Sequence, residues 1–184
     1  GNNVVLYAPR RYGKTSLVFK VMAELESKNC LCIYFDLLSV YSLESFAKSF
    51  LLKIKEKQSK TERFVKTISS YIKSIKPKLT FDENGSPEFG VDFLEDEVSV
   101  QTISDLLDLP EKMAENGQKV IVIFDEFQEI AKFEKYGLEG LLRSKIQQQR
   151  TAYMFLGSKT HLLTEMFADK KRPFYNSAFI MQIG

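Results

Sequence analysis

Residues 8–15 read A-P-R-R-Y-G-K-T, and these residue types at this spacing are typical of a phosphate-binding loop. A short apolar run precedes the segment and a helical pattern follows it, which is the strand–loop–helix context that the motif requires. Gly13 allows the chain to turn so that main-chain N–H groups approach phosphate oxygens. Lys14 is predicted to reach the β- and γ-phosphates of a nucleotide, and the Thr15 hydroxyl to ligate Mg²⁺. The predicted nucleotide contacts are Ala8, Pro9, Arg10, Arg11, Tyr12, Gly13, Lys14, Thr15 and Ser16.

Ala8 stands at the first position of this loop, where the usual pattern has glycine. That position ends the preceding strand, so we expect a methyl group to be tolerated there. The side chains of Arg10, Arg11 and Tyr12 are expected to point away from the phosphates and to leave the loop open. The departure at Ala8 therefore does not exclude nucleotide binding.

An acidic pair, Asp125 and Glu126, follows the apolar run V-I-V-I-F about 110 residues after the loop. The run predicts a buried strand, and ligands of open α/β sheets bind at the carboxyl ends of such strands. Asp125 is predicted to contact Mg²⁺ through its water shell, and Glu126 to act as the general base on the attacking water. The same pair on its own would also fit a solvated strand end, so its functional interpretation depends on the phosphate-binding loop.

Gly157 and Ser158 end a third predicted strand. Ser158 is expected near the attacking water and the γ-phosphate, and it would serve equally as the N-cap of the helix that follows. His161, the only histidine, is interpreted as a partly exposed helix residue, and Asp36 as a structural cap at the same edge of the sheet. An arginine at the γ-phosphate is expected of an active hydrolase. The sequence does not choose among its candidates, Arg143, Arg150 and Arg172.

The elements that must position these residues alternate between strands and helices, which predicts an α/β fold with a parallel sheet. Strands are predicted at residues 4–7, 30–36, 119–125, 151–156 and 178–183, and helices at 14–28, 43–54, 64–75, 100–115, 138–148 and 161–167. Around Asn84-Gly85, two short runs predict a small surface β-hairpin insertion at about residues 77–93.

The composition is that of an ordinary soluble globular domain, with 184 residues, 44% apolar and 27% charged. A net charge of +2 gives no global field for nucleic acid or membrane. A basic run at 53–78, followed by acidic residues at 82–115, is interpreted as solvated faces, with a DNA-contacting face as the alternative. Cys30 and Cys32, two apart in a predicted strand, are expected on one face as reduced thiols. These features predict a cytoplasmic protein without a membrane span.

The chain resembles the archaeal-type ATPase family, an AAA+-related group of signal-transduction NTPases (the STAND group). Three segments carry the resemblance: L-Y-A-P-R-R-Y-G-K-T-S-L, V-I-V-I-F-D-E-F-Q-E-I, and F-L-G-S-K-T-H-L-L-T-E-M-F with R-P-F-Y after it. They extend over residues 4–175. The family loop usually reads G-P-R-R-x-G-K-T, so Pro9 and both arginines match it. The family often has P-L-Y-G-R after the third segment, where this chain has Asn176 and Ser177 in place of Gly-Arg.

The resemblance implies a P-loop NTPase core, a three-layer sandwich whose five-stranded parallel sheet has the order 5-1-4-3-2. It implies a Walker A loop, a Walker B strand, and ATP and Mg²⁺ as ligands. Family members continue into a helical lid, a winged-helix domain and in some cases an effector domain, so residues 1–184 are expected to be the ATPase core of a longer protein without them. The loss of Gly-Arg is expected to make hydrolysis slow or dependent on a partner.

The leading functional hypothesis is Mg²⁺-dependent ATP hydrolysis that serves as a nucleotide-controlled switch. The alternatives are a nucleotide-binding interaction scaffold with little hydrolysis, and a DNA-associated ATPase. GTP is disfavoured because the sequence has no Asn-Lys-x-Asp pattern for reading guanine. The predicted partners are ATP or ADP and the lid and effector domains, and the sequence leaves a homo-oligomer open.

Overall fold

The computed structural model describes residues 3–58, 61–81, 87–94, 98–114 and 117–183. The strands are β1 (Val4–Tyr7), β2 (Cys30–Asp36), β3 (Ile75–Phe81), β4 (Pro87–Phe93), β5 (Lys119–Asp125), β6 (Ala152–Gly157) and β7 (Phe179–Gln182). The helices are α1 (Lys14–Ser27), α2 (Leu43–Glu56), α3 (Thr61–Tyr71), α4 (Val100–Met113), the 3₁₀ helix η1 (Phe127–Tyr136), α5 (Leu138–Gln148) and α6 (Thr160–Ala168).

Five of the strands form one sheet in the order β2-β5-β6-β1-β7. Each neighbouring pair in it is parallel. If the two hairpin strands are left out and the other five are numbered along the chain, this order reads 5-1-4-3-2 from the β7 edge. The parallel α/β class predicted from the alternating pattern is confirmed. All five carboxyl ends therefore meet at one edge of the sheet, where the loops with the predicted site residues begin.

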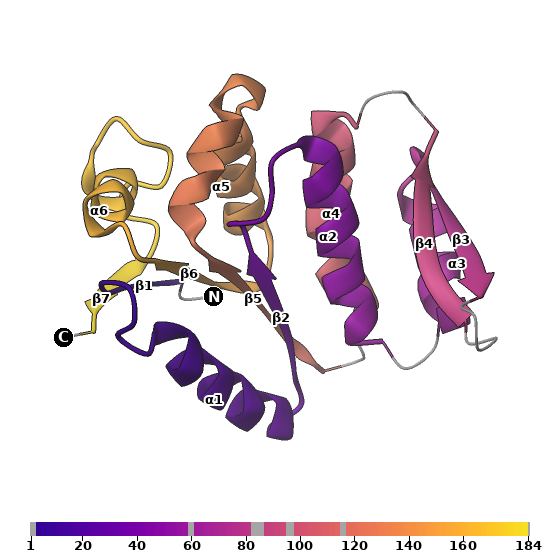
Figure 1. Ribbon diagram of the computed structural model, residues 1–184, viewed down its shortest axis with the longest axis horizontal. Helices are drawn as coiled ribbons and strands as arrows, with labels where there is room; N and C mark the ends of the chain where they lie inside the picture. Colours follow the sequence, from indigo (N-terminus) through magenta and orange to yellow (C-terminus); the bar gives the residue numbers. More distant parts are fainter. Residues whose placement is uncertain (1–2, 59–60, 82–86, 95–97, 115–116, 184) are drawn as a thin grey trace.

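The sheet separates two clusters of apolar side chains and is covered on both faces except at the edge strand β7, whose side chains are exposed. Along β2, Leu31 and Ile33 belong to the large cluster, whereas Cys32 between them belongs to a small cluster with Val18 of α1. This alternation follows from the period of two along a strand. Figure 1 shows the resulting three layers, with α1 below the sheet and α2, α4, α5 and α6 above it.

Aromatic rings fill the large cluster above β5 and β6. Phe124 and Phe155, from these neighbouring strands, are fully buried and stack with ring centroids 6.2 Å apart. Phe127, Phe167 and Phe174 pack on Phe155 at 4.5–5.4 Å. Because these rings come from β6, η1, α6 and the segment after it, they fix the loops that follow β5 and β6 against the sheet.

The predicted hairpin insertion is present as the antiparallel pair β3 and β4. It packs on α3, where the Phe64 and Phe89 rings meet edge to face at 4.9 Å. Figure 1 shows α3 and the hairpin beyond α2 and α4, on the side of the molecule opposite α6 and β7. The tip of the hairpin, including Asn84-Gly85, lies outside the described residues.

One sequence prediction about an element was wrong, and one element was not predicted. The helix expected over residues 64–75 ends at Tyr71, and Ile75 begins β3 instead. The i, i+3 spacing of Ile72 and Ile75 fits a helix, but pairing with β4 takes Ile75 into the hairpin, where Pro77 is tolerated on an edge strand. The sequence analysis also missed η1, because its start depends on the backbone conformation of the residue before it.

The prediction that Cys30 and Cys32 lie on one face of their strand is confirmed. Cys30 and Cys32 are free, and both face the small cluster beside α1, with Cys32 fully buried. None of the helices in the described part of the chain has the length and apolar character needed to cross a bilayer.

Candidate functional site

The loop after β1 has the backbone of an anion-binding loop. Arg11 and Gly13 both adopt left-handed conformations, with φ of 68° and 75°. A Cβ on Gly13 would meet no atom within 4 Å, so glycine serves the backbone conformation there rather than relieving crowding. Helix α1 starts immediately, with Leu17 N donating to Gly13 O at 2.9 Å, so its N-terminal N–H groups face the loop. The left-handed turn and the helix N-terminus together direct main-chain N–H groups and the positive end of the helix dipole to the same side, an arrangement that suits a phosphate group.

The side chains of this loop differ in their exposure to solvent. Ala8 is fully buried at the end of β1, and its methyl group is accommodated there. Arg10, Arg11 and Tyr12 are exposed and do not cover the loop. Lys14 is only 7% exposed, and its Nζ donates to Ala8 O at 2.8 Å and Pro9 O at 3.3 Å. The ammonium group thus lies over the loop, held by main-chain oxygens.

The hydroxyl of Thr15 lies 3.2 Å from Asp125 Oδ2, a contact that joins the start of α1 to the end of β5. The Tyr34 hydroxyl from β2 donates to the same oxygen. Asp125 is 5% exposed, and its other oxygen accepts from Glu126 N at 2.8 Å. A hydroxyl and a carboxylate side by side are the ligand types that Mg²⁺ prefers.

Tyr34 is a site residue that the sequence analysis missed. It lies in the middle of an apolar strand, and only the register of β2 with β5 brings its hydroxyl to Asp125. Burial, and then the hydrogen bond and the charge of Asp125, raise the pKa of Tyr34. The phenol therefore stays protonated and acts as a donor throughout the physiological range.

The carboxylate of Glu126 is held by three donors. Ser158 approaches Oε2 with Oγ at 2.8 Å and N at 3.4 Å, and Gln128 Nε2 donates to the same oxygen. Burial raises the pKa of Glu126, but the hydrogen bonds from Gln128 and Ser158 and the attraction of Lys14 outweigh it, so the pKa lies below its ordinary value. Glu126 is therefore ionised at neutral pH and can accept a hydrogen bond from water.

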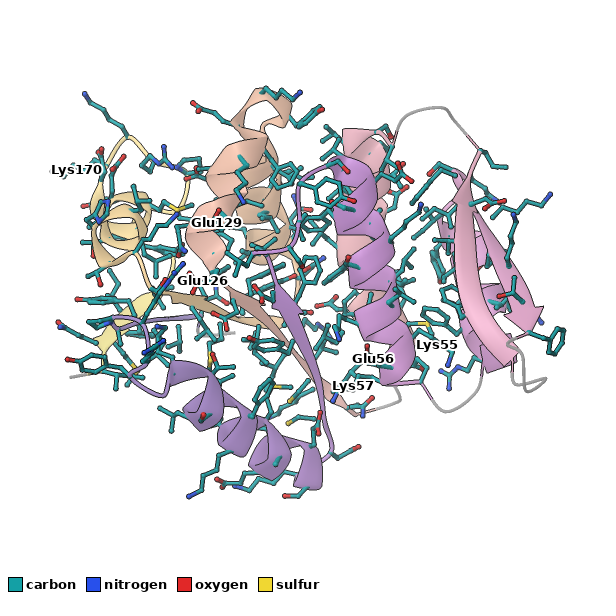
Figure 2. All side chains as sticks on the ribbon, in the orientation of Figure 1. Lys55, Glu56, Lys57, Glu126, Glu129 and Lys170 are labelled. Atoms are coloured by element: carbon teal, nitrogen blue, oxygen red, sulfur yellow. The ribbon has the colours of Figure 1, made fainter. Side chains whose placement is uncertain are left out.

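A second contact joins the same two loops. Glu129 is 7% exposed and pairs with Lys159 at 2.8 Å and with Lys132 at 2.7 Å. Figure 2 shows Glu126 and Glu129 on the same side of the molecule, in the region between α5 and α6. The loops after β5 and β6 are thus connected at two points, through Glu126–Ser158 and through Glu129–Lys159.

Two further residues that the sequence singled out, Asp36 and His161, lie outside the group of side chains around Glu126. Asp36 pairs with Asp125 in the strand register, but its Oδ1 accepts from Leu38 N at 2.8 Å, which is the predicted capping role. His161 is exposed on α6. Neither contacts the groups that converge on Glu126.

The three arginine candidates differ in position. Arg150 lines a groove with Cys30 and Thr151 at the amino ends of the strands, so it lies at the opposite edge of the sheet from Glu126. Arg143 donates to Pro173 O at 3.0 Å. Arg172 pairs with Glu139 at 2.8 Å. None of the three is directed at the site by these contacts.

Asn176, where the family often has glycine, adopts a backbone conformation that favours glycine. It has a φ of 52°, in the left-handed region that asparagine tolerates better than most residues. Its N–H donates to Phe167 O at 3.2 Å, and the Ser177 hydroxyl donates to Phe174 O at 2.6 Å. The turn is therefore compatible with glycine at this position, and Ser177 stands where the family has the arginine.

The basic run is neutralised in several places. Lys53 pairs with Glu56 at 2.9 Å, Lys57 pairs with Glu26 at 2.5 Å, and a lysine of β3 pairs with an aspartate of β4. Figure 2 shows Glu56 and Lys57 at the end of α2, well away from Glu126. These pairs favour the interpretation as a solvated face over a DNA-contacting one.

The model of a family described as an ATPase domain predominantly from Archaea matches residues 1–176. The chain belongs to this family. The resemblance stated from the three motifs is thereby confirmed, and the match covers the loop, the acidic pair and the Gly-Ser turn of this archaeal-type ATPase domain. A comparison with curated proteins gave no match.

Solved structures with a similar fold include archaeal ORC and Cdc6 proteins. The Aeropyrum pernix ORC2 protein, in ADPNP-ADP complexes, superposes with a TM-score of 0.54 at 15% identity over 98% of this chain and 41% of that one. The ORC1 protein of the same organism, in complex with DNA, superposes with a TM-score of 0.51 at 14% identity, over 99% of this chain and 38% of that one. Cdc6p from Pyrobaculum aerophilum superposes with a TM-score of 0.50 at 12% identity, over 98% of this chain and 39% of that one. At these identities the likeness concerns the fold, and the ATPase domain spans about two fifths of each relative.

Proposed function

We propose that this ATPase domain binds ATP with Mg²⁺ at the carboxyl edge of its sheet and hydrolyses it, as a switch controlled by the bound nucleotide. The observation that carries the proposal is the convergence of three loops. Thr15 meets Asp125 at 3.2 Å, and Glu126 meets Ser158 at 2.8 Å, so the phosphate loop, the acidic pair and the polar turn form one site. Membership of an ATPase family supports nucleotide as the ligand.

Each residue has a role that its position supports. The left-handed turn at Gly13 directs main-chain N–H groups to the phosphates, and Lys14 exchanges its bonds to Ala8 O and Pro9 O for bonds to phosphate oxygens. Thr15 and Asp125 would hold Mg²⁺, whose chemistry there is to neutralise charge on the phosphate oxygens. Among the described residues, no cluster of three or more acidic, histidine or cysteine side chains encloses a metal by itself, which fits a cation held mainly by phosphates and water.

The ionised carboxylate of Glu126 orients a water molecule and accepts its proton as the water attacks the γ-phosphate. Ser158 holds Glu126 in place and lies beside the position expected for the γ-phosphate. Because Ser158 and Glu126 share a hydrogen bond, a change in one is transmitted to the loop of the other. We expect the conformations of these two loops to differ between the ATP-bound and ADP-bound states, with the Ser158–Glu126 hydrogen bond linking them.

Single-turnover hydrolysis of ATP by the intact protein, with ATP binding measured in the same samples, tests the proposal. Glu126→Gln is expected to bind ATP with affinity close to wild type and to lose at least about 100-fold in the rate of hydrolysis. Glu134→Gln, at an exposed glutamate of η1, is the matched control and should behave as wild type. Equal rates for wild type and Glu126→Gln would refute the assignment of Glu126 as the base.

One observation favours a second candidate, a nucleotide-binding scaffold with little hydrolysis. Oε2 of Glu126 is already occupied by Ser158 and Gln128, and its lowered pKa makes the carboxylate a weaker base. If wild type binds ATP tightly and is as inert as Glu126→Gln, the scaffold is the better description.

A further inference from the structure

Gln128, two residues after the acidic pair, has an unusual environment. Its side chain is 3% exposed, and its Nε2 donates to Glu126 Oε2. Its Oε1 is buried and has no hydrogen-bond partner. A buried amide with one end unsatisfied costs stability, whereas an apolar side chain of similar length would fill the same space without that cost. Packing alone therefore does not account for a glutamine here.

The amide orientation is set by its neighbour. If the amide were reversed, Oε1 would face the carboxylate of Glu126, which only accepts hydrogen bonds. The donor must consequently face Glu126, and the unsatisfied acceptor must face away from it, toward Gly157. Gln128 therefore donates through Nε2 to Glu126, while its Oε1 accepts no hydrogen bond.

Gly157 provides the space that this orientation needs. A Cβ at position 157 would lie 2.4 Å from Gln128 Oε1 and 3.2 Å from a methyl group of Leu163. The backbone of Gly157 does not adopt a positive φ, so glycine is not needed for the conformation. A side chain at this position would instead have to displace the end of the Gln128 side chain. Gly157 and Gln128 therefore form a matched pair across the loops after β6 and β5.

The backbone of Glu126 increases the need for such support. Its φ of 49° and ψ of 45° place it in the left-handed region, which is costly for a residue of this kind and is found at functional sites. The bonds from Gln128 and Ser158 all reach Oε2. They leave Oε1 as the oxygen that can face water.

We propose that Gln128 is a positioning residue for Glu126: its amide fixes the carboxylate through Oε2 and presents Oε1 to the attacking water, and Gly157 provides the space for it. The proposal rests on the proposed hydrolysis of ATP, and it assigns a role to a residue of the second motif to which the sequence gave none.

Steady-state kinetics on the intact protein test this role first. Gln128→Met keeps the length of the side chain and removes the donor, so kcat is expected to fall by about 10- to 100-fold while KM for ATP stays within about twofold. Gln101→Met is the matched control, because Gln101 Nε2 also donates to a carboxylate, Asp105, but on the exposed surface of α4. A kcat within twofold of wild type in folded Gln128→Met would overturn the proposal.

Gly157→Ala tests the pair from the other side. The added methyl group must displace Gln128, so this variant should lose kcat as Gln128→Met does. The double variant should be little worse than either single variant, because both remove the same contact. Losses that multiply in the double variant would show that the two positions act separately and would contradict the matched pair.

A spectroscopic measurement separates this proposal from the hydrolysis on which it rests. The side-chain amide signals of Gln128 in an NMR spectrum of nucleotide-free protein should exchange slowly with solvent and should shift when Glu126 is replaced in Glu126→Ala. Signals that are unchanged in Glu126→Ala would refute the contact. An inert wild type with the expected signals would instead refute the hydrolysis and leave the contact established.

Discussion

Thr15 Oγ1 lies 3.2 Å from Asp125 Oδ2, although 110 residues separate them in the chain. The contact exists because β1 and β5 run in the same direction in one sheet, separated by β6, so both loops start at the same edge. It places a hydroxyl and a carboxylate together beside the turn at Gly13.

Lys14→Met should abolish most of the ATP binding. The substitution removes the ammonium group that lies over the loop at 2.8 Å from Ala8 O and keeps the apolar stem. Ligand at about 100 times its Kd stabilises a folded protein by about 2.7 kcal/mol, so wild type should show a clear rise in Tm with ATP and Mg²⁺. Lys14→Met should show little, and Lys20→Met, at an exposed position of α1, should match wild type. An equal Tm rise in Lys14→Met would contradict the assignment of the loop.

Tyr34→Phe should raise the Mg²⁺ concentration needed for half-maximal hydrolysis by about 10-fold. The ring contact with Phe19, at 4.8 Å, is retained, and only the hydroxyl that orients Asp125 is lost. Loss of a group that orients a metal ligand typically costs 10- to 100-fold in metal affinity or activity. The measurement is a Mg²⁺ titration at constant ATP.

Tyr41→Phe is the control for that titration, since Tyr41 is 83% exposed. If Tyr34→Phe and Tyr41→Phe both follow the wild-type Mg²⁺ curve, Tyr34 has no part in holding the Mg²⁺ ligand.

Phe155→Ala should lower the free energy of unfolding by about 3–5 kcal/mol, the usual cost of a large cavity in a packed core. Phe155 is fully buried between Phe124 and Phe127 and touches rings of α6 and the segment after it. Urea unfolding followed by circular dichroism measures the loss. Phe81→Ala, at a residue that is 70% exposed on the hairpin, should stay within about 0.5 kcal/mol of wild type. Similar losses for both variants would mean that Phe155 is not in the core.

Cys32 should react with thiol reagents only after the protein unfolds. Burial raises the pKa of Cys32 to about 11, so at pH 8 only about one thiol in a thousand is ionised, and the side chain is fully enclosed. Because the thiolate is the reactive form, any residual rate should rise about tenfold from pH 8 to pH 9. A disulfide reagent used on Cys30→Ser, with and without denaturant, isolates this thiol. Rapid reaction of folded Cys30→Ser at pH 8 would contradict the buried position.

The parallel sheet, and those parts of the site whose residues are adjacent in the chain, could be predicted from the amino-acid sequence. The alternation of apolar strands and amphipathic helices specified a parallel α/β fold, because a buried parallel sheet requires both. Gly13, Lys14 and Thr15 are adjacent, so their spacing alone predicts a phosphate-binding turn. Asp125 could also be predicted from a local pattern, because it ends the most apolar strand in the chain.

Contacts that depend on strand register and side-chain direction could not be predicted from the sequence and are seen only in the folded chain. Tyr34 reaches Asp125 only because β2 pairs with β5, and Gln128 reaches Glu126 only because Glu126 turns the backbone left-handed. Ile75, which was expected in a helix, likewise lies in a strand because β3 pairs with β4. Each of these contacts depends on strand pairing or on an unusual backbone conformation, and neither can be predicted from the local sequence pattern. Periodicity gives the elements, whereas the chemistry of the site follows from the edge at which those elements end.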